Sequence, residues 1–397
     1  MNAPRFDLVT VGGGLAASAL GKAVAERGAK VLIIEQETRF KDRVRGELLS
    51  SWGVAEAKHL GLFEFLVKTC AAEIPWVDLG FGPRELPATT ICKLPAISYS
   101  HPEMQEALLQ AAEESGAEVR RGITVKGVET GPSPAVLVAS GSHTEKISAR
   151  LVAAADGRGS AVRKWAGFTS QKNLQPYLFA GVLMSGVAAR HDLAWLVFNP
   201  GNGMVVGTIP ITKDRFRSYL GYSNSANYRL QGHGSFDLFR SECAKALPLA
   251  GDFYAHAEPI GPLASFDGGD SWVEHPYREG VALLGDAAAT SDPTFGQGMP
   301  FAFRDARTLR DHLLRESDWD RAGHLYAEQH DAAYRNCHAV MGWLRTVFQE
   351  QTPEASRIRE KALPLIDEDM TRVPDHLFDG PELPADDSVR ARFFGEI

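Results

Sequence analysis

Residues 12–17 read Gly-Gly-Gly-Leu-Ala-Ala, a G-x-G-x-x-A pattern that can bring the backbone close to phosphate groups. The pattern follows an apolar, strand-like run at 6–11 and opens an alanine-rich run at 15–26 that suits a helix, which Gly28 would cap. A second apolar run at 30–34 completes a strand–helix–strand unit of the usual size. In this setting the glycines predict a site for the pyrophosphate of a dinucleotide.

Each residue of the glycine turn has an expected role. Gly12 permits the tight turn, Gly14 lets the backbone approach the pyrophosphate, and Ala17 is small enough for close packing of helix on strand. Leu15 and Ala16 open the helix, where free N–H groups and the helix dipole favour an anion. We therefore expect all five residues at the cofactor.

An acidic residue ends the second strand of this unit. Glu35, followed by Gln36, stands where a carboxylate can accept hydrogen bonds from both hydroxyls of an adenosine ribose. The same carboxylate would repel a 2′-phosphate, so the site favours FAD or NAD over NADP. Up to this point the sequence does not distinguish FAD from NAD.

Two later segments, each directly after an apolar strand-like run, could contact a flavin. Residues 285–288 read Gly-Asp-Ala-Ala, followed by Asp-Pro-Thr-Phe-Gly-Gln-Gly-Met at 292–299 and a helix expected to start at Pro300. Residues 156–163 read Asp-Gly-Arg-Gly-Ser-Ala-Val-Arg, although Asp-Gly after a strand is often just a turn. Asp286 is placed to accept a hydrogen bond from a sugar-alcohol hydroxyl, which in FAD would be ribitol.

The loop and helix after Asp286 suit a flat ring. Gly296 and Gly298 let backbone N–H groups reach the ring, and Pro300 fits the first helical position because its missing N–H would be unpaired there anyway. The positive helix end would stabilise the negative charge of a reduced flavin. The loop residues expected at the ring are Pro293, Gly296, Gln297, Gly298 and Met299.

Together these segments resemble the flavoprotein monooxygenases of the para-hydroxybenzoate hydroxylase type. That family shows a G-x-G-x-x-G start, a D-G motif near the middle and a G-D motif before a G-Q-G-type loop and helix, in this order. The resemblance covers residues 6–170 and 277–315. It implies FAD as the cofactor and NAD(P)H as a transient electron donor. It is less specific for the reaction, because halogenases and prenyl reductases share the scaffold.

The resemblance implies further contacts with the cofactor. Asp156, with Arg163, would steady the flavin domain and could contact the nicotinamide donor. Arg45, in an Arg-Gly-Glu segment, could contact the FAD pyrophosphate. Lys41 and Arg43 lie in the same loop, so a solvated basic loop is the alternative interpretation.

One position departs from the family pattern. The family usually has an arginine or glutamine near the start of the helix at 103, where this sequence has His101. A neutral imidazole could still hydrogen-bond ribitol or phosphate, so His101 stays a candidate contact. Val125, in the strand-like region that follows this helix, is a further candidate.

The predicted fold is α/β: a Rossmann-type, glutathione reductase-like FAD domain interleaved with a substrate domain and followed by a C-terminal helical tail. Residues 177–275 are rich in aromatic and β-branched residues with turn signals, which predicts a mainly antiparallel sheet. Within it, the glycines at 201, 203 and 207 indicate a hairpin, because no helix pattern follows them. The expected parts are 1–75, 100–175 and 277–340 for the FAD domain, 76–99 and 176–276 for the substrate domain, and 341–397 for the tail, whose last stretch, 371–397, should wrap the surface.

Composition narrows the classes of partner and compartment. The 397 residues include 44% hydrophobic and 23% charged residues, with a net charge of −8, which does not favour nucleic acid or an anionic membrane. No apolar stretch reaches the roughly 18 to 20 residues of a membrane span. The four cysteines are far apart, so we expect no metal site and a reduced, cytoplasmic compartment. Monomer and homodimer both remain open.

The predicted reaction is oxygen transfer to an aromatic or polyketide-like small molecule. NAD(P)H would reduce FAD, and dioxygen would add at flavin C4a to give a hydroperoxide that hydroxylates the substrate. We name no catalytic side chain, because this chemistry demands no nucleophile or metal ligand from the protein. The aromatic side chains that could line the substrate site, or belong to the core, are Trp195, Phe198, Tyr219, Tyr222 and Phe266.

Three alternatives stay open. A flavin-dependent halogenase would need a lysine near the substrate, for which Lys93 is the candidate, but Trp195 lacks the second tryptophan of the halogenase W-x-W motif. A prenyl or double-bond reductase would use the same scaffold without oxygen. A non-catalytic flavin-binding protein is the remaining class.

Overall fold

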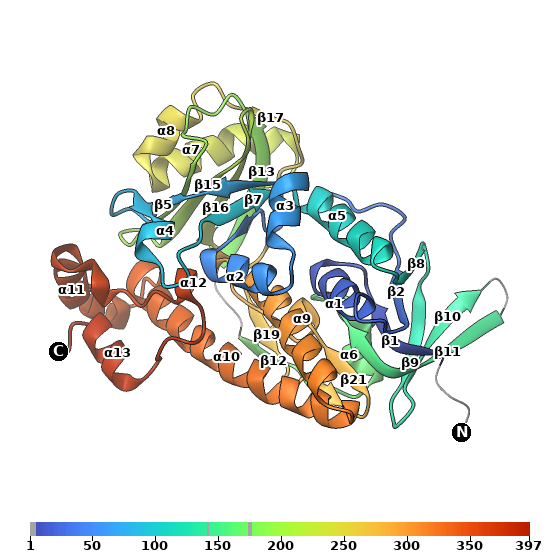
Figure 1. The fold of residues 1–397 in the computed structure, drawn as a ribbon. Helices are drawn as coiled ribbons and strands as arrows, with labels where there is room; N and C mark the ends of the chain where they lie inside the picture. Colours follow the sequence, from blue (N-terminus) through green and yellow to red (C-terminus); the bar gives the residue numbers. More distant parts are fainter. Residues whose placement is uncertain (1–4, 141–142, 174–176) are drawn as a thin grey trace.

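A parallel β-sheet assembled from separated stretches of sequence forms one half of the fold (Figure 1). The computed structural model describes residues 5–140, 143–173 and 177–397. The strands of this sheet are Phe6–Val11 (β1), Val31–Glu35 (β2), Glu118–Arg121 (β8), His143–Ala154 (β11), Tyr277–Arg278 (β20) and Val281–Leu283 (β21). The order β21-β11-β1-β2-β8 is parallel throughout, and β20 adds antiparallel at the β21 edge.

Apolar side chains cover both faces of the central strands, as expected for parallel strands buried between two layers. β2 reads Val-Leu-Ile-Ile-Glu, and all five residues are buried. The helices on one face are Leu15–Ala25 (α1), His101–Glu114 (α5) and Gly298–Arg315 (α9). The elements on the other face are Val125–Glu129 (β9), Ala135–Ser140 (β10) and Ala161–Trp165 (α6). This layering confirms the predicted Rossmann-type architecture.

A second, mainly antiparallel sheet forms the other half. Its strands are Trp76–Asp78 (β5), Arg84–Glu85 (β6), Tyr177–Ser185 (β13), Leu193–Asn199 (β14), Met204–Thr212 (β15), Arg215–Ser223 (β16), Glu258–Pro259 (β17) and Ala264–Asp267 (β18). The order is β17-β13-β16-β15-β14-β5-β6, with β18 also paired to β13. The β14–β5 pair is parallel, and β14 and β15 form the predicted hairpin.

The two faces of this second sheet have different neighbours, because successive side chains in a strand point to opposite sides. Leu220 and Tyr222 of β16 lie in the cluster under the helices Phe236–Ala246 (α7) and Pro248–Phe253 (α8), which cover the outer face in Figure 1. Tyr219 therefore points to the inner face, toward the parallel sheet.

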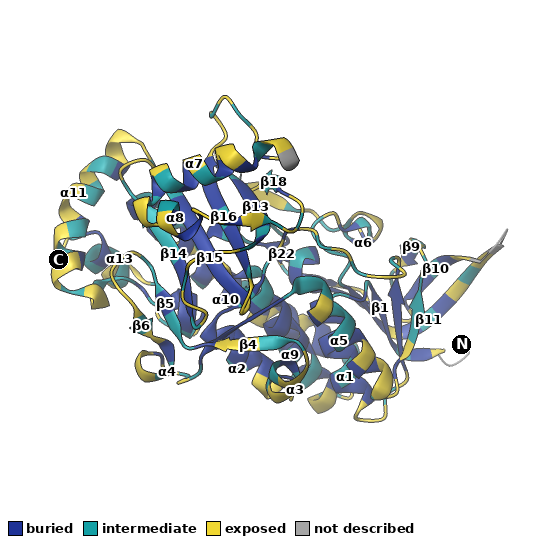
Figure 2. Ribbon diagram, turned by 90° about the horizontal axis from the view of Figure 1, so that it is seen from above, coloured by how far each residue is buried: buried dark blue, intermediate teal, exposed yellow. Residues whose placement is uncertain are grey.

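The C-terminal part is helical. Its helices are Trp319–Phe348 (α10), Pro353–Glu368 (α11), His376–Asp379 (α12) and Asp387–Phe393 (α13). The long helix α10 spans both halves of the fold in Figure 1, and α11 and α13 lie at its far end. In Figure 2 these end helices carry exposed outer surfaces, whereas the central strands of both sheets are buried. Among the described residues, no helix is long and apolar enough to cross a membrane.

Short elements connect the two sheets. The remaining helices are Ser51–His59 (α2), Phe63–Thr69 (α3) and Leu86–Thr89 (α4). Two small sheets are formed by Leu48–Leu49 (β3), Ala71–Ile74 (β4) and Ala96–Tyr99 (β7), and by Gln171–Asn173 (β12), Asp270–Trp272 (β19) and Ala289–Thr290 (β22). The strands β5 and β6 join the second sheet although they precede α5 in sequence.

Candidate active site

A cavity of about 740 Å³ lies where the carboxyl ends of the parallel strands face the inner side of the second sheet. A ligand pocket at the carboxyl ends of parallel strands is the usual arrangement in α/β folds. The predicted cofactor residues that line it are Gly12, Gly14, Leu15, Ala16, Glu35, Gln36, Arg45, His101, Val125, Asp156, Asp286, Pro293, Gly296, Gly298 and Met299. Ala17 and Gln297 are buried but do not belong to the described lining.

In the glycine turn at the start of α1, Gly12 and Gly14 differ in the space around them. Gly12 has a φ of +99°, and a Cβ there would lie 2.4 Å from the carbonyl oxygen of Ala155, so a side chain has no room. Gly14 has an ordinary φ of −72°, and the nearest atom to an added Cβ is Nε2 of Gln105, 3.7 Å away. Gly12 is thus required by the protein's own backbone, whereas Gly14 leaves open space that a phosphate could fill.

Glu35 is held in place at the end of β2. Its Oε2 accepts a hydrogen bond from the Gly13 amide at 2.7 Å, and its Oε1 accepts one from the Glu37 amide at 2.8 Å. Each carboxylate oxygen keeps a further lone pair. The side chain is therefore fixed at the cavity wall with acceptor capacity left for ligand hydroxyls.

Asp286 follows β21 and lines the cavity, as do Arg43, Arg45 and Arg158. Burial raises the pKa of its carboxyl, and the charges of Arg158, Arg45 and Arg163 oppose that rise. Asp156 has a structural role in addition to lining the cavity: its Oδ2 accepts from the Ala161 amide at 2.8 Å, at the start of α6. The Asp-Gly segment thus anchors a helix as well as forming a turn.

His101 and Gln105 sit one turn apart on α5 and both line the cavity. Nδ1 of His101 lies 2.8 Å from the Gly46 carbonyl oxygen, which can only accept, so Nδ1 carries the proton. Burial lowers the pKa of the imidazole, so the ring is neutral at pH 7 and Nε2 is an acceptor. Gln105, not singled out from the sequence, supplies the glutamine that the family pattern leads one to expect.

The loop before α9 differs in detail from the prediction. Helix α9 begins at Gly298, so Pro300 is its third residue and not its first; the N–H groups of the whole first turn lack helical acceptors, and proline fits there equally well. Gln297 turns away from the cavity. Its Oε1 accepts from the Trp52 indole at 3.0 Å, and its Nε2 donates to the Phe295 carbonyl at 2.7 Å.

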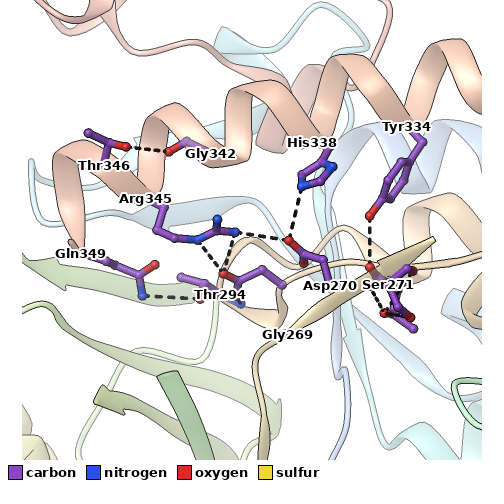
Figure 3. A network of polar contacts seen from close by, with 12 residues as sticks. Gly269, Asp270, Ser271, Thr294, Tyr334, His338, Gly342, Arg345, Thr346 and Gln349 are labelled. Atoms are coloured by element: carbon purple, nitrogen blue, oxygen red, sulfur yellow. Dashed lines mark hydrogen bonds and ion pairs between the residues drawn. The ribbon is translucent and has the colours of Figure 1, made fainter. Parts of the chain in front are cut away.

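A buried ionic network ties this loop to α10 (Figure 3). Nη2 of Arg345 lies 3.1 Å from Oδ2 of Asp292 and 3.5 Å from Oδ2 of Asp270, and His338 adds a contact of 3.5 Å to Asp270. Asp292 in turn accepts from the Thr294 amide at 2.9 Å. Burial raises the pKa of Asp292, and the charge of Arg345 opposes the rise, so the ion pair favours the charged form of this carboxyl.

The inner face of the second sheet gives the cavity an apolar wall. The side chains on this wall are Phe179, Leu196, Val205, Ile209 and Phe266. Of the nominated aromatics, Tyr219 and Phe266 line the cavity. Trp195 packs on Phe253 beneath α8 and Tyr222 lies under α7, so these two belong to the core. Phe198 is half-buried, stacks on Phe295 and lines a second, smaller pocket.

The tail also reaches the cavity. Leu377 and Phe378 of α12 belong to its lining, so the segment 371–397, expected to wrap the surface, also contributes to the cavity. The ion pair Arg84–Asp375, with Nη2 and Oδ2 2.5 Å apart, and the 2.7 Å bond from the Ile91 amide to Asp379 hold this helix. No local pattern in the sequence signals such a long-range contact.

Glu47 was also missed as an individual residue. It is 1% exposed yet lines the cavity, accepts a hydrogen bond from the Tyr219 hydroxyl and pairs with Arg217, whose Nε lies 3.2 Å from Glu47 Oε1. Nη2 of Arg217 donates to Asp42 at 2.6 Å. The sequence signal that could have pointed to Glu47 is an acidic residue between Arg45 and the apolar pair at 48–49.

Comparison with known proteins identifies the family. The family model described as "FAD binding domain" matches residues 5–340. The chain belongs to this FAD-binding family. It is an FAD-dependent oxidoreductase of the para-hydroxybenzoate hydroxylase-like group, and FAD is its cofactor, as the sequence motifs predicted.

Relatives of this FAD-dependent oxidoreductase include named monooxygenases. The chain is 25% identical to the rifampicin monooxygenase of Streptomyces venezuelae over 361 residues, which cover 89% of this chain and 74% of the relative. The p-nitrophenol 4-monooxygenase of Pseudomonas putida has the same fold, with a TM-score of 0.77, 16% identity and coverage of 96% and 100% of the two chains. CmlS, a flavin-dependent halogenase, also shares the fold, with a TM-score of 0.75, 20% identity and coverage of 100% and 78%.

Proposed function

We propose that this flavoenzyme is a monooxygenase that uses NAD(P)H and O₂ to insert one oxygen atom into an aromatic or polyketide-like small molecule. The observation that carries the proposal is that one cavity joins the glycine turn at Gly14 to the apolar wall of the second sheet. A cofactor bound along the strand ends would therefore meet a substrate held on that wall.

The proposed contacts with FAD follow from the chemistry of the lining. Gly14 and the N-terminus of α1 would face the pyrophosphate, Glu35 the ribose, and Asp286 the ribitol. The loop before α9 would face the flavin ring. Bound FAD supplies the redox chemistry, taking electrons from NAD(P)H and activating dioxygen.

The protein would contribute orientation and exclusion of water. The apolar wall and the α12 side chains Leu377 and Phe378 suit a planar, largely apolar substrate. A low-water site would also limit loss of the activated oxygen to solvent. In this proposal residues 1–75, 100–175 and 277–340 bind the cofactor, and 76–99 and 176–276 bind the substrate.

One observation weighs against halogenation through Lys93. This lysine is exposed and lies outside the described cavity lining, so it has no access to a substrate held there. A halogenase of the expected kind would need a lysine between flavin and substrate. Lys93 therefore fits the alternative of a solvated surface charge.

The test uses the FAD-loaded protein with NADH or NADPH and a panel of phenols and polycyclic aromatics under ¹⁸O₂. The expected result is substrate-dependent oxidation of the reduced nicotinamide and a product carrying one ¹⁸O atom. A product that contains halogen, formed only with added chloride or bromide, would replace the proposal with halogenation. Reduction of a substrate double bond without oxygen would replace it with a reductase.

A further inference from the structure

We propose that Gly207 is a specificity-determining residue of the oxygenation site. The space left by its missing side chain would seat an apolar group of the substrate, such as a ring edge or a short alkyl chain. The inference rests on the proposed function, because it narrows the class of substrate that the site would take. A substrate of this class carries an apolar projection on the side that faces the second sheet.

The hairpin of β14 and β15 does not need a glycine at position 207. Its turn lies between Asn199 and Met204, which pair with each other, and Gly207 follows inside β15. The φ of Gly207 lies outside the left-handed region that favours glycine, and its pairing with both neighbouring strands is regular. A glycine in a strand interior weakens the strand, and without a bulge or bend it marks a place where another group approaches closely.

Side chains surround the space above Gly207 on four sides of the inner face of the second sheet. Leu196 and Tyr219 lie directly opposite Gly207 on the two neighbouring strands, β14 and β16. Val205 and Ile209 lie two residues before and after it on β15, so their side chains point to the same face. All four residues line the cavity, as Gly207 does. Gly207 is therefore the floor of a depression in the apolar wall.

Two other glycines on this face show how the protein fills such a space with its own side chains. A Cβ on Gly181 or on Gly221 would lie 2.5 Å from a neighbouring side chain, which for Gly181 is that of Tyr219. Above Gly207 the nearest described atom is Cδ2 of Leu196, which would lie 3.3 Å from an added Cβ. Gly181 and Gly221 do not belong to the described lining of the cavity, whereas Gly207 does. Of the three spaces, the one above Gly207 opens to the cavity.

The position of Tyr219 keeps this depression open. Its Cε1 is the atom that lies beside Gly181, whereas Gly207 faces only its Cβ and Cδ2, which would lie 3.6 and 3.8 Å from an added Cβ. The Tyr219 hydroxyl donates a hydrogen bond to buried Glu47. Turning the ring over Gly207 would break this bond and leave a buried acceptor without its donor, which is unfavourable. The depression is therefore formed by the protein before a substrate binds.

The surroundings of the depression favour an apolar occupant. The three atoms nearest to a Cβ on Gly207 are all carbon atoms, of Leu196 and Tyr219. The backbone of β15 pairs with strands on both sides. A polar group seated there would lose its hydrogen bonds to water without gaining new ones, which is costly. An apolar group instead gains about fourfold in affinity for each CH₂ group that it buries.

The first test measures binding to the oxidised, FAD-loaded protein, so it does not depend on turnover. The probes are phenol and its 4-alkyl derivatives from methyl to butyl, titrated by the change in flavin absorbance. In the wild type the affinity should rise about fourfold per CH₂ until the depression is filled. Gly207→Ala places a methyl group on the floor, so the rise should end about one carbon earlier, with a loss of about fourfold or more for the longest probe that fits the wild type. A rise that ends at the same chain length in both proteins would overturn the inference.

Gly127→Ala is the matched control for this substitution. Gly127 lies in β9 opposite Leu137, and its added Cβ would lie 3.2 Å from Cδ1 of that leucine, but it does not belong to the described lining. Both alanine variants should fold like the wild type, because Gly→Ala at an unstrained position reduces the freedom of the unfolded chain, and thermal unfolding checks this. Adding Leu196→Ala to Gly207→Ala removes the side chain nearest to the new methyl group and should restore binding of the longer probes. An equal loss in Gly127→Ala, or a double variant that recovers nothing, would overturn the inference.

The second test uses turnover of the same probes with NADH or NADPH and O₂. Gly207→Ala should lower the ratio of kcat/KM for 4-propylphenol to that for 4-methylphenol by about fourfold or more, with the affinity for FAD unchanged. Absence of oxygenation in the wild type, with the dependence of binding on chain length intact, would defeat the proposed function alone. A wild type that binds none of the probes, or binds all of them equally, would overturn the inference about Gly207.

Discussion

Gly12 approaches Ala155 so closely that a Cβ on the glycine would lie 2.4 Å from the Ala155 carbonyl oxygen, whereas the nearest described atom to a Cβ on Gly14 would be 3.7 Å away. Substitutions at these two glycines of one motif should therefore have different effects. Gly12→Ala should destabilise the protein even without cofactor, by about 1–3 kcal/mol for the φ of +99° and more for the clash. Gly14→Val should fold normally but lose FAD affinity by more than about tenfold.

Urea denaturation of the FAD-free proteins and fluorescence titration with FAD separate these outcomes. Gly28→Ala is a useful control, because Gly28 also has a positive φ, of +86°, but no atom of the described residues lies within 4 Å of its added Cβ. Tight FAD binding by Gly14→Val would contradict the assignment of this open space to the pyrophosphate.

Replacing Arg345 should leave two buried carboxylates without their positively charged partner. The side chains of Asp270 and Asp292 are both 2% exposed and share this guanidinium, and Figure 3 shows its contact with Asp270. Breaking such a buried pair costs about 3–5 kcal/mol because an uncompensated charge is left behind. Arg345→Met should therefore lower the free energy of unfolding by about this amount and weaken FAD binding, since Asp292 begins the loop before α9.

Two further variants distinguish this mechanism from general damage to the C-terminal helices. Arg359→Met removes an arginine that donates to the carbonyl oxygens of Val347 and Glu350, so its effect should be smaller. Adding Asp292→Asn to Arg345→Met should recover part of the stability, because it removes one of the two buried carboxylates that have lost their partner. An equal loss in the two single variants would contradict the ionic explanation.

The parallel half of the fold was predictable because its signals are local. Gly12, Glu35 and Asp286 each lie at or just after the end of a short apolar strand, and a parallel sheet brings the ends of all such strands to one edge. The start of α9 was predicted at Pro300, but the helix begins at Gly298. Proline fits any position in the first turn, because the N–H groups there have no helical acceptor, so its position does not fix the first residue.

The rest of the site depends on tertiary contacts that no local pattern encodes. Gln297 lies in a motif typical of flavin sites, yet Trp52, from a distant segment, takes its side-chain oxygen. Phe378 reaches the cavity only because the tail returns to it through Arg84–Asp375. Glu47 looked like part of a basic loop, and its burial follows from the approach of β16.

The tail should influence which substrates are accepted. Phe378 lines the cavity, while Phe393, in the same hydrophobic cluster, is equally buried outside the described lining. Phe378→Leu should enlarge the substrate space and shift the kcat/KM ratio of bulky to small substrates by about tenfold, the scale set by removing a few carbons from an apolar pocket. Phe393→Leu should cost comparable stability and leave the ratio unchanged. The same shift of the ratio in both variants would mean that it follows from lost stability and not from the shape of the cavity.

Glu47 should make the stability of the protein depend on pH in a specific window. Its pKa is about 7 when folded against 4.5 for an ordinary glutamate, so the folded state holds the proton more tightly. The stabilisation this provides is complete below about pH 4.5 and is lost progressively as the pH rises through about 7. A shift of this size corresponds to a loss on the order of 3 kcal/mol across the window.

The Glu47→Gln variant has no proton to lose at this position. Between pH 5 and pH 8, urea denaturation at saturating FAD should therefore show the free energy of unfolding of the wild type falling relative to that of the variant, by on the order of 3 kcal/mol. Parallel curves for the two proteins would mean that the carboxyl ionises normally in the folded state, which would contradict the prediction.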